Sequence, residues 1–596
     1  MEEPSLMQFS LTGPLTDVDA AWALLGDTEL LARLAGSPSV EMEIRPDSAD
    51  YPEVRGRFIG PSVIRHDFVE PDSRWVHHKW FEQVRVIEGP FMRKMRYRAR
   101  LEAQDGGVVP HVDFSVDFAH LPATWFGGGF VRATERAWKQ ALSLLPAPGD
   151  ISNAAHLRSL PAPVARAVEA WRQRDGVPTD LVDRVSLFLQ TARAPDLNRI
   201  RPFVLADTWG LERDIVLIAF LEGVLAGAFE LVWVSRCPRC TAGVSRADSL
   251  SDLADHAACA SCRISFSPSL DDDVEVVFAA HPAIRPPPGE TFCTLYPIDR
   301  PEVRAMLTVA AGASETVRVP LTAGTWRLGS GGEQEDQVLT VGAYGAASHA
   351  WSPSALPSVA LLAGEVELSL HNPTDGRLRV QLAGRPDLDR VVSAARLATF
   401  PAYRHRFGPS ALATDVRLSV RSVAVLFTDL SGSAALYDAH GDGAAFALVH
   451  AHFRILDEVV SETGGARVKT IGDALMAAFS DPLDAVRAGL EMQRRFQVWA
   501  QTLSLDTPPG LKVGIHWGPA MAVHTDQAGL DWFGGTVNLA ARCEGQARAG
   551  EVIWTADVHD RPGLLDMLAH EAVSFECYDA QVKGITKAVG MVRVTV

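Results

Sequence analysis

The chain lacks an uninterrupted apolar run long enough to cross a membrane. Its most apolar stretch, residues 215–234, is interrupted by two glutamates and two glycines: Glu222, Gly223, Gly227 and Glu230. Charged side chains are costly in lipid, so a buried helix that leads into a strand fits this stretch better than a membrane span. We therefore expect no membrane partner.

Positive charge is scarce. The chain has 56 lysines and arginines against 73 aspartates and glutamates, a net charge of -17. Nucleic-acid binding requires basic side chains that neutralise phosphates, so this balance argues against a nucleic-acid partner. A site for a metal–nucleotide complex is local and is not excluded. The first residues, MEEP, also lack the basic start and apolar run of a signal peptide, so we expect a cytoplasmic protein.

Cysteine is also rare, with 7 residues in 596, which excludes a disulfide scaffold. Four of the seven form two CxxC pairs separated by 18 residues: Cys237, Cys240, Cys259 and Cys262. Thiolates in such turns converge on a tetrahedral metal, and this spacing is typical of a zinc ribbon. We expect a structural Zn²⁺ held by a zinc ribbon at 237–262, with no open position for a substrate.

The N-terminal part predicts an α+β domain over residues 1–148. Segments 75–81, 95–101 and 112–118 alternate between apolar and polar residues like half-exposed antiparallel strands, and helical patterns precede and follow them. Two helices around a curved sheet resemble the START-like helix-grip fold. Aromatic residues at strand spacing favour a packed core, and a ligand-sensing cavity is the alternative.

Two short motifs in the last third of the chain each place an aspartate beside a glycine-bearing turn. Asp429 follows the apolar run VAVLF, and Asp473 lies in the Gly-Asp turn of KTIGD. Ser431, Gly432 and Ser433 open a helical pattern with serine as the expected N-cap, and N–H groups at a helix start attract phosphate. Two carboxylates beside such a turn are the components of a two-metal phosphoryl-transfer site.

Three further motifs follow in order: GIHWGP from Gly514, DWFGGTVNLAAR from Asp531 and VKG from Val582. Any one of these motifs alone would be weak, but five in order are specific. Over residues 418–596, roughly the last 30 per cent of the chain, the sequence resembles the catalytic domain of class III adenylate/guanylate cyclases. The resemblance implies a ferredoxin-like α/β fold for this segment.

The resemblance also implies a ligand for each motif. Asp429 and Asp473 match two metal-binding aspartates, which would hold two ions of Mg²⁺ or Mn²⁺ per site. Ser431, Gly432 and Ser433 would contact the substrate phosphates.

Lys469 and Asp531 match the pair that recognises the purine. A lysine only donates hydrogen bonds and a carboxylate only accepts them, which suits N1 and the amino group of adenine, whereas guanine reverses both groups. Guanylate cyclases of this family typically carry glutamate and cysteine there. We therefore expect ATP as the substrate.

Asn538 and Arg542, four residues apart on an expected helix, match residues that orient the ribose and stabilise charge on the α-phosphate. Lys583 matches a phosphate-binding lysine, with Lys587 as the alternative. Each site in this family forms between two chains, so we expect a head-to-tail homodimer. Ala434 and Gly535 depart from the family pattern, which we expect to change the rate.

The expected function is therefore an adenylate cyclase that converts ATP into 3′,5′-cyclic AMP and pyrophosphate. The alternatives are a guanylate cyclase and a catalytically silent nucleotide-binding regulatory protein.

The middle of the chain predicts a regulatory region over 150–384, after a linker at 145–149. It should have a helical part to about residue 235, the zinc ribbon, an antiparallel β part, and then a helical linker at 385–417 that breaks near Pro401. The β part is expected from four alternating segments: 274–278, 316–321, 324–328 and 366–370. With its CxxC pairs and the motifs RPF, ADTWG and F…YR…F, the region resembles one found upstream of some bacterial class III cyclase domains. We expect it to respond to a small-molecule or protein regulator. The whole chain is expected to be multidomain α+β.

Overall fold

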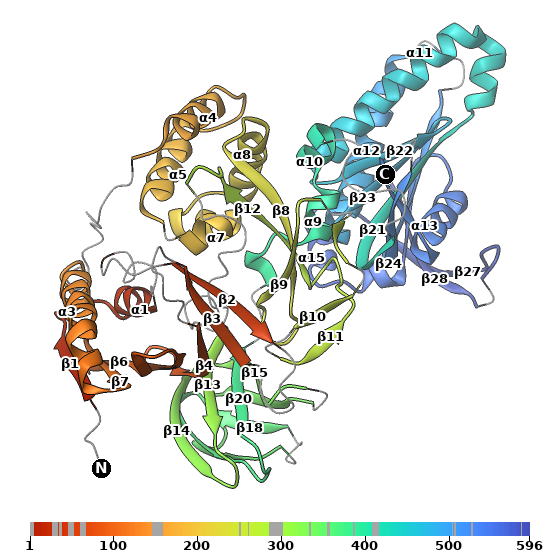
Figure 1. Cartoon of the computed structure of the whole chain (residues 1–596). Coiled ribbons are helices and arrows are strands. Elements are labelled where there is room, and N and C mark those ends of the chain that lie inside the picture. The colour runs from red at the N-terminus through yellow and green to blue at the C-terminus, as the bar shows by residue number, and fades with distance from the viewer. Residues whose placement is uncertain are drawn as a thin grey trace.

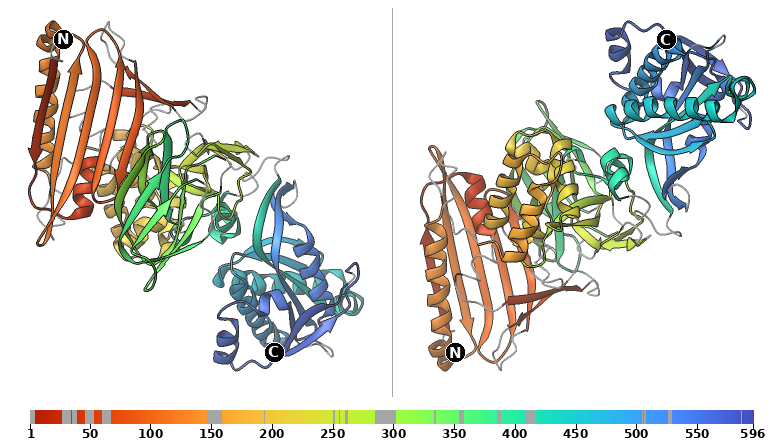
Figure 2. Two further views of the ribbon diagram at one scale, coloured as in Figure 1. Left: turned by 90° about the horizontal axis from the view of Figure 1, so that it is seen from below. Right: turned by 90° about the horizontal axis from the view of Figure 1, so that it is seen from above.

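The computed structural model describes most of the chain: residues 5–26, 34, 39–45, 53–59, 67–145, 159–192, 194–249, 252–254, 256–259, 262–284, 302–332, 335–353, 358–384, 388–407, 417–503, 505, 508–525, 529–585 and 587–596. The N-terminal sheet lies at one end of an elongated molecule and the C-terminal unit at the other (Figures 1 and 2). Most of the predicted linker at 145–149 lies outside the described residues.

The N-terminal part is an antiparallel sheet with a long helix, α3, along one side (Figure 2). Burial alternates along the strand that contains residues 112–118, as predicted. The START-like resemblance of this part stays a prediction. Its elements are β1 (Ser5–Thr12), α1 (Val18–Gly26), β2 (Ser39–Arg45), β3 (Glu53–Ile59), β4 (Asp67–Val76), β5 (Trp80–Glu88), β6 (Met92–Gln104), β7 (Gly107–Phe118) and α3 (Leu121–Leu142).

The aromatic segment 75–81 is not the single strand that its alternation predicted. β4 ends at Val76, β5 begins at Trp80, and residues 77–79 form the turn between them. His78 adopts φ 61°, a left-handed conformation that residues other than glycine rarely take. The end of β4 and the start of β5 both contain aromatic residues at alternate positions, so the sequence pattern continues across the turn and did not reveal it.

The middle part begins with a helical bundle, as predicted for residues 150–235. The apolar stretch 215–234 covers most of a helix and most of the strand that follows it, which confirms that prediction. Among the described residues, no helix is both long and apolar enough to cross a membrane. The elements are α4 (Ala162–Arg172), α5 (Thr179–Thr191), α6 (Ala194–Asn198), α7 (Pro202–Trp209), α8 (Arg213–Leu225), β8 (Phe229–Arg236), β9 (Gly243–Ala247), β10 (Ala257–Cys259), β11 (Ile264–Phe266) and β12 (Val274–Ala280).

The β part that follows joins the N-terminal sheet. Met306 pairs with Trp75 and Ala305 with Val76, so β13 extends the sheet in the order β1-β7-β6-β5-β4-β13-β20-β15-β16-β18. Pairing between segments so far apart leaves no local pattern in the sequence. The elements are β13 (Val303–Val309), β14 (Ser314–Leu321), β15 (Gly324–Gly329), β16 (Gln337–Gly342), β17 (Ser348–Trp351), β18 (Val359–Leu362), β19 (Gly364–His371) and β20 (Leu378–Gly384).

Two details of this β part differ from the sequence analysis. β16 pairs with β18, and β17 with β19, in parallel, so the part is not purely antiparallel. The predicted strand 274–278 is present in β12, but it pairs with β8 in a separate three-stranded sheet. Alternation predicts a strand, whereas its partner depends on packing.

The segment before the C-terminal unit packs back onto the middle part. It comprises η3 (Leu388–Arg390), α9 (Ala394–Thr399) and α10 (Pro401–Phe407), so the predicted break near Pro401 is found. Arg406 forms an ion pair with the buried Glu222, which also pairs with Arg174. The ring of Tyr403 lies 6.2 Å from that of Trp233. Residues 385–387 and 408–416 of the predicted linker lie outside the described residues.

The C-terminal unit has the predicted ferredoxin-like core. Its first elements run β21–α11–β22–β23–α12–β24, and the strands lie in the order β22-β23-β21-β24. The elements are β21 (Arg417–Ser431), α11 (Ser433–Glu462), β22 (Ala466–Ile471), β23 (Ala474–Phe479), α12 (Pro482–Thr502), β24 (Gly510–Thr525), β25 (Gly529–Phe533), α13 (Gly535–Gln546), β26 (Glu551–Thr555), α14 (Ala556–His559), α15 (Leu564–His570), β27 (Glu576–Ala580) and β28 (Val589–Thr595).

Candidate active site and metal centre

The two predicted metal-binding aspartates lie at the same end of neighbouring strands. Thr428 of β21 faces Leu475 of β23, so Asp429 lies close to the turn that carries Asp473. That turn is the predicted two-residue hairpin, since Ile471 pairs with Ala474 and Gly472 adopts φ 64°. Both aspartates are only partly buried, which leaves their carboxylates within reach of a ligand.

A lysine and a glutamate that the sequence analysis missed complete this acidic cluster. Lys512 of β24 pairs in register with Asp429 and forms an ion pair with it, and its Nζ lies 3.1 Å from Oε1 of Glu544 on α13. Burial alone would lower the pKa of Lys512, but hydrogen bonds to both carboxylates outweigh it and raise that pKa.

Glu544 adds a third carboxylate beside the two predicted metal ligands. Burial raises the pKa of Glu544, Lys512 opposes this, and the charges of Asp429 and Asp473 raise it further. Neither Lys512 nor Glu544 belonged to a quoted motif position, and only the strand register and helix packing bring them to Asp429.

The helix start near the aspartates differs from the prediction. The N-cap of α11 is Gly432, with φ 88° and ψ 10°, and no side chain caps the helix. Ser431 is the last residue of β21 and not the cap, because β21 continues past Asp429. Glycine takes this left-handed conformation without a steric cost. The side chain of Ser433 lies outside the described residues.

The predicted purine-recognition pair is assembled within one chain. Lys469 on β22 donates a hydrogen bond from Nζ to Oδ2 of Asp531 on β25, over 2.6 Å. The Lys469 side chain is 30% exposed, while that of Asp531 is 4% exposed. Oδ1 of Asp531 accepts a further hydrogen bond from the backbone N–H of Trp532 at 2.8 Å. The carboxylate is therefore held in place, and the ammonium group retains two N–H donors.

Helix α13 carries the predicted Asn538 and Arg542 on its exposed side. Within the described part of the chain, neither side chain forms a hydrogen bond or ion pair. The helix lies directly on β24, since a Cβ on Gly514 would come within 1.9 Å of the backbone nitrogen of Glu544. Gly514, the first residue of the motif GIHWGP, is therefore required for the close approach of α13 to β24.

Lys583 lies in the turn after β27 and is exposed, as is Lys587. Gly584 follows it with φ 90°. Among the described residues, the structure gives Lys583 no contact with either aspartate, so its predicted role stays a prediction.

The four predicted zinc-binding cysteines come together. The Sγ atoms of Cys237, Cys240, Cys259 and Cys262 all lie within 4.8 Å of one another and are buried. Those of Cys240 and Cys259 are 3.7 Å apart. A zinc tetrahedron with bonds of about 2.3 Å has edges of about 3.8 Å, so this donor set fits a tetrahedral ion.

The two CxxC segments share two features in their described residues. The residue after the second cysteine, Thr241 or Arg263, has a left-handed conformation with φ 58° or 53°. A backbone N–H donates to the first sulfur of each turn, from Arg239 to Cys237 and from Cys262 to Cys259, both at 3.4 Å. Such N–H···S bonds favour thiolates, the form in which cysteine binds metal.

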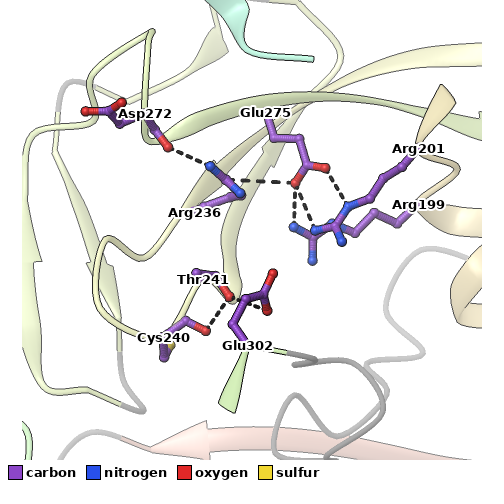
Figure 3. Close-up of polar contacts among 8 residues, drawn as sticks. All are labelled: Arg199, Arg201, Arg236, Cys240, Thr241, Asp272, Glu275 and Glu302. Atoms are coloured by element: carbon purple, nitrogen blue, oxygen red, sulfur yellow. Dashed lines mark hydrogen bonds and ion pairs between the residues drawn. The ribbon is translucent and has the colours of Figure 1, made fainter. Parts of the chain in front are cut away.

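A buried cluster of one glutamate and three arginines lies beside these turns (Figure 3). Glu275 on β12 is fully buried, and its carboxylate accepts hydrogen bonds from Arg199 and Arg201, each at 2.6 Å. Arg236 approaches it to 3.9 Å. Burial alone would raise the pKa of Glu275, but the charges of the arginines outweigh it and lower that pKa to about 2.

Two family models match separate parts of the chain. Residues 417–590 match the adenylate and guanylate cyclase catalytic domain. Residues 168–289, which include most of the helical bundle and the four cysteines, match a family of unknown function, DUF5939. The second match assigns no activity, so a regulatory role for this region stays a prediction.

Known proteins resemble the chain only in part. The receptor-type adenylate cyclase ESAG 4 of Trypanosoma brucei brucei is 29% identical over 212 residues, covering 29% of this chain and 17% of that protein. The receptor-type adenylate cyclase GRESAG 4.1 of the same organism is 33% identical over 170 residues, covering 22% of this chain and 14% of that protein. The chain thus spans less than a fifth of the length of these curated relatives.

Among solved structures, the adenylyl cyclase CyaB from P. aeruginosa is 22% identical, covers 30% of this chain and 96% of that chain, and has a TM-score of 0.27. The family match confirms what the five motifs indicated: residues 417–590 carry an adenylate or guanylate cyclase catalytic domain.

Proposed function

We propose that residues 418–596 convert ATP into 3′,5′-cyclic AMP and pyrophosphate at the interface of a homodimer, under the control of the upstream parts. The observation that carries the choice of ATP is the assembled pair of Lys469 and Asp531. The names of the relatives, which are adenylate cyclases, agree with it.

The pair suits adenine because each partner offers one kind of hydrogen bond. The ammonium group of Lys469 donates to N1 of the base, and the carboxylate of Asp531 accepts from the exocyclic amine. Asp531 is held by Trp532 and is nearly buried, so a guanine, with its donor and acceptor reversed, would leave buried polar atoms unpaired.

Asp429 and Asp473 are the residues that would hold two Mg²⁺ or Mn²⁺ ions. Asp429 on β21 and Asp473 in the turn before β23 have partly exposed carboxylates, which fit these hard cations because such cations prefer oxygen ligands. When bound, such ions neutralise the triphosphate and make the ribose 3′-hydroxyl a better nucleophile. Before the metal ions bind, Lys512 balances the charge of Asp429.

The remaining residues position the reacting groups. Asn538 orients the ribose, and the guanidinium of Arg542 stabilises charge that develops on the α-phosphate. The 3′-oxygen attacks the α-phosphorus, the bond to the bridging oxygen breaks, and pyrophosphate leaves with that bond's electrons. Both side chains are exposed and unpaired in the described part of the chain, so they are available to substrate held by a second copy.

The substrate phosphates have two further sets of partners. The turn formed by Ser431, Gly432 and Ser433 supplies backbone N–H groups, and Lys583 supplies a positive charge. At the other site, the cysteines Cys237, Cys240, Cys259 and Cys262 hold a structural Zn²⁺, since four buried sulfurs leave no position for a substrate.

The test is cyclic nucleotide production by the purified full chain, with ATP or GTP and with Mg²⁺ or Mn²⁺. The proposal expects cyclic AMP from ATP and none from Asp473→Ala. Cyclic GMP alone would show a guanylate cyclase. Nucleotide binding without turnover under every condition would favour the silent regulatory protein.

A second experiment tests base recognition directly. Lys469→Glu combined with Asp531→Cys should shift the ratio of kcat/KM for ATP over GTP towards GTP by about 100-fold. The single variant Lys469→Glu separates the loss of activity with ATP from the gain of activity with GTP. An unchanged ratio in the double variant would show that the pair does not recognise the base.

A further inference from the structure

We propose that the four-cysteine site is a metal-dependent clasp that holds the sheet that runs from β1 to β18, which has twelve strands when β2 and β3 are included, against the part of the chain that contains the helical bundle. The inference rests on the proposed Zn²⁺ site and adds a role to it. The first CxxC turn directly follows β8 (Phe229–Arg236), and both Arg239 in this turn and Cys262 in the second CxxC segment contact the loop that joins β15 to β16.

The first CxxC turn presents an arginine to the sheet. Arg239, between Cys237 and Cys240, lies with Nε 2.7 Å from Oδ2 of Asp336, and its Nη1 donates to the carbonyl of Gly332 at 3.0 Å. A fork-to-fork pair between largely buried groups depends on the orientation of both partners.

The second turn makes a backbone contact with the same loop. The N–H of Gly332 donates to the carbonyl of Cys262 at 2.8 Å. Gly331 lies so close that a Cβ would come within 3.0 Å of that carbonyl oxygen, and its φ of 83° favours glycine as well. The two CxxC segments therefore contact the same loop, at Gly331, Gly332 and Asp336.

A third contact connects the turns to the first strand of the β part. Oγ1 of Thr241 lies 3.0 Å from Oε2 of Glu302, just before β13, and 2.7 Å from the carbonyl of Cys240 (Figure 3). β13 is the strand that joins the N-terminal sheet. The CxxC segments thus contact the sheet at two places, at Glu302 and at the loop residues Gly332 and Asp336.

Among the described residues, only a small apolar core surrounds the CxxC segments. Their local core consists of the four cysteines and Ala242, with Val244 and Ile264 packed against it, and the adjoining strands β10 and β11 have three residues each. A lobe this small cannot bury enough apolar surface to order itself, so its geometry depends on the ion. Loss of the ion would release Arg239 and the Cys262 carbonyl together.

The ligand chemistry selects a soft divalent cation. Thiolates without a competing carboxylate or imidazole favour zinc over magnesium or calcium. Four thiolates around Zn²⁺ leave a net charge of two minus, which the neighbouring Arg239 partly offsets.

The experiment uses the full chain. Metal content is measured on the purified protein, and hydrogen–deuterium exchange is then followed in peptides from residues 324–342. The samples are the parent, the parent treated with a chelator and then resupplied with Zn²⁺, and the variants Cys262→Ser and Asp336→Asn. Glu367→Gln, which removes an exposed ion pair with Arg318 on the same β part, is the matched control.

The proposal expects about one zinc per chain. Removal of the zinc should speed exchange in 324–342 by about tenfold, and Zn²⁺ should restore it. Asp336→Asn should keep its zinc and show the same faster exchange, while Glu367→Gln matches the parent.

Three outcomes would contradict the proposal: the first would reject the metal site, the second the clasp, and the third the role of Arg239. A protein that binds neither Zn²⁺ nor Co²⁺ through its thiolates has no metal site, whether or not it is a cyclase. Bound zinc whose removal leaves exchange in 324–342 unchanged would keep the site and reject the clasp. An effect of zinc removal without an effect of Asp336→Asn would reject Arg239 as the contact that transmits it.

Discussion

The chain contains two clusters of ionisable side chains that differ in exposure and in balance. At Asp429, one lysine pairs with two carboxylates, the charge of Asp473 acts on the same cluster, and the side chain of Asp429 is 31% exposed. At Glu275, one fully buried carboxylate is surrounded by three arginines. In the first cluster, the carboxylates outnumber the lysine and are partly exposed to solvent. In the second cluster, the arginines pair with the carboxylate on every side.

This difference separates a binding site from a structural one. A partly exposed surplus of carboxylates attracts cations and substrate complexes, and removing one carboxylate costs the fold little. A buried carboxylate paired on every side offers no room for a ligand, and removing it leaves uncompensated arginines. Substitutions in the two clusters should therefore have opposite signatures.

The largest expected effect is on catalysis. Asp429→Asn should lower kcat for cyclic AMP formation by about 10³-fold or more, because a neutral amide binds the divalent ions weakly. The thermal unfolding midpoint should stay near that of the parent, and Asp579→Asn, an exposed residue of the same unit, serves as the control. Loss of folding together with activity would place Asp429 with the structural cluster.

The next effect is on stability. Glu275→Gln should destabilise the middle part by about 3–5 kcal/mol, because Arg199, Arg201 and Arg236 lose their shared partner. Hydrogen exchange of peptides from residues 274–280 measures the local unfolding free energy. Glu367→Gln, in an exposed ion pair, should change it by less than about 0.5 kcal/mol. Equal effects of the two variants would contradict the comparison.

The pH dependence of stability also tests whether Glu275 has a structural role. The pKa of Glu275 is lowered from the usual 4.5 to about 2, so its stabilising effect is present above about pH 4.5 and is lost as the pH falls towards 2. The unfolding free energy of the parent relative to Glu275→Gln should therefore fall by about 3 kcal/mol over this range. A difference that does not vary with pH would mean that the carboxylate titrates normally in the folded chain.

The smallest effect concerns the counter-charge in the acidic cluster. Lys512→Met should raise the affinity for Mn²⁺ in the absence of nucleotide by about tenfold, since an ammonium group no longer competes for Asp429. Isothermal titration calorimetry measures it, with Lys139→Met on the distant helix α3 as the control. An unchanged or weaker affinity would show that Lys512 does not oppose the cation.

Local motifs predicted much of the candidate site. Asp429, Asp473, Lys469, Asp531 and the four cysteines were found from short patterns in which glycines and spacing restrict the backbone. Lys512 and Glu544 were missed because their relation to Asp429 comes from strand register and from the packing of α13 on β24. The serine N-cap was wrong because β21 runs on to Ser431 and leaves Gly432 as the cap.

The same division holds for the fold. Periodicity predicted the helical bundle and the helix-to-strand change at 215–234, whereas the ferredoxin-like fold of the C-terminal unit was implied by the resemblance to class III cyclases. Periodicity did not reveal that β4 pairs with β13, or that β12 leaves the β part to pair with β8.

The sequence by itself determined which residues are proposed to carry the chemistry: the two aspartates, the pair of Lys469 and Asp531, Asn538 and Arg542, and the paired cysteines. These residues stand in short motifs, where chain connectivity alone fixes their neighbours. Only the tertiary structure decided which charges meet, including Lys512 with Asp429, Glu275 with its arginines, and Arg239 with Asp336. Such contacts join segments distant in sequence, and the free energy that selects them comes from burying and packing whole elements together.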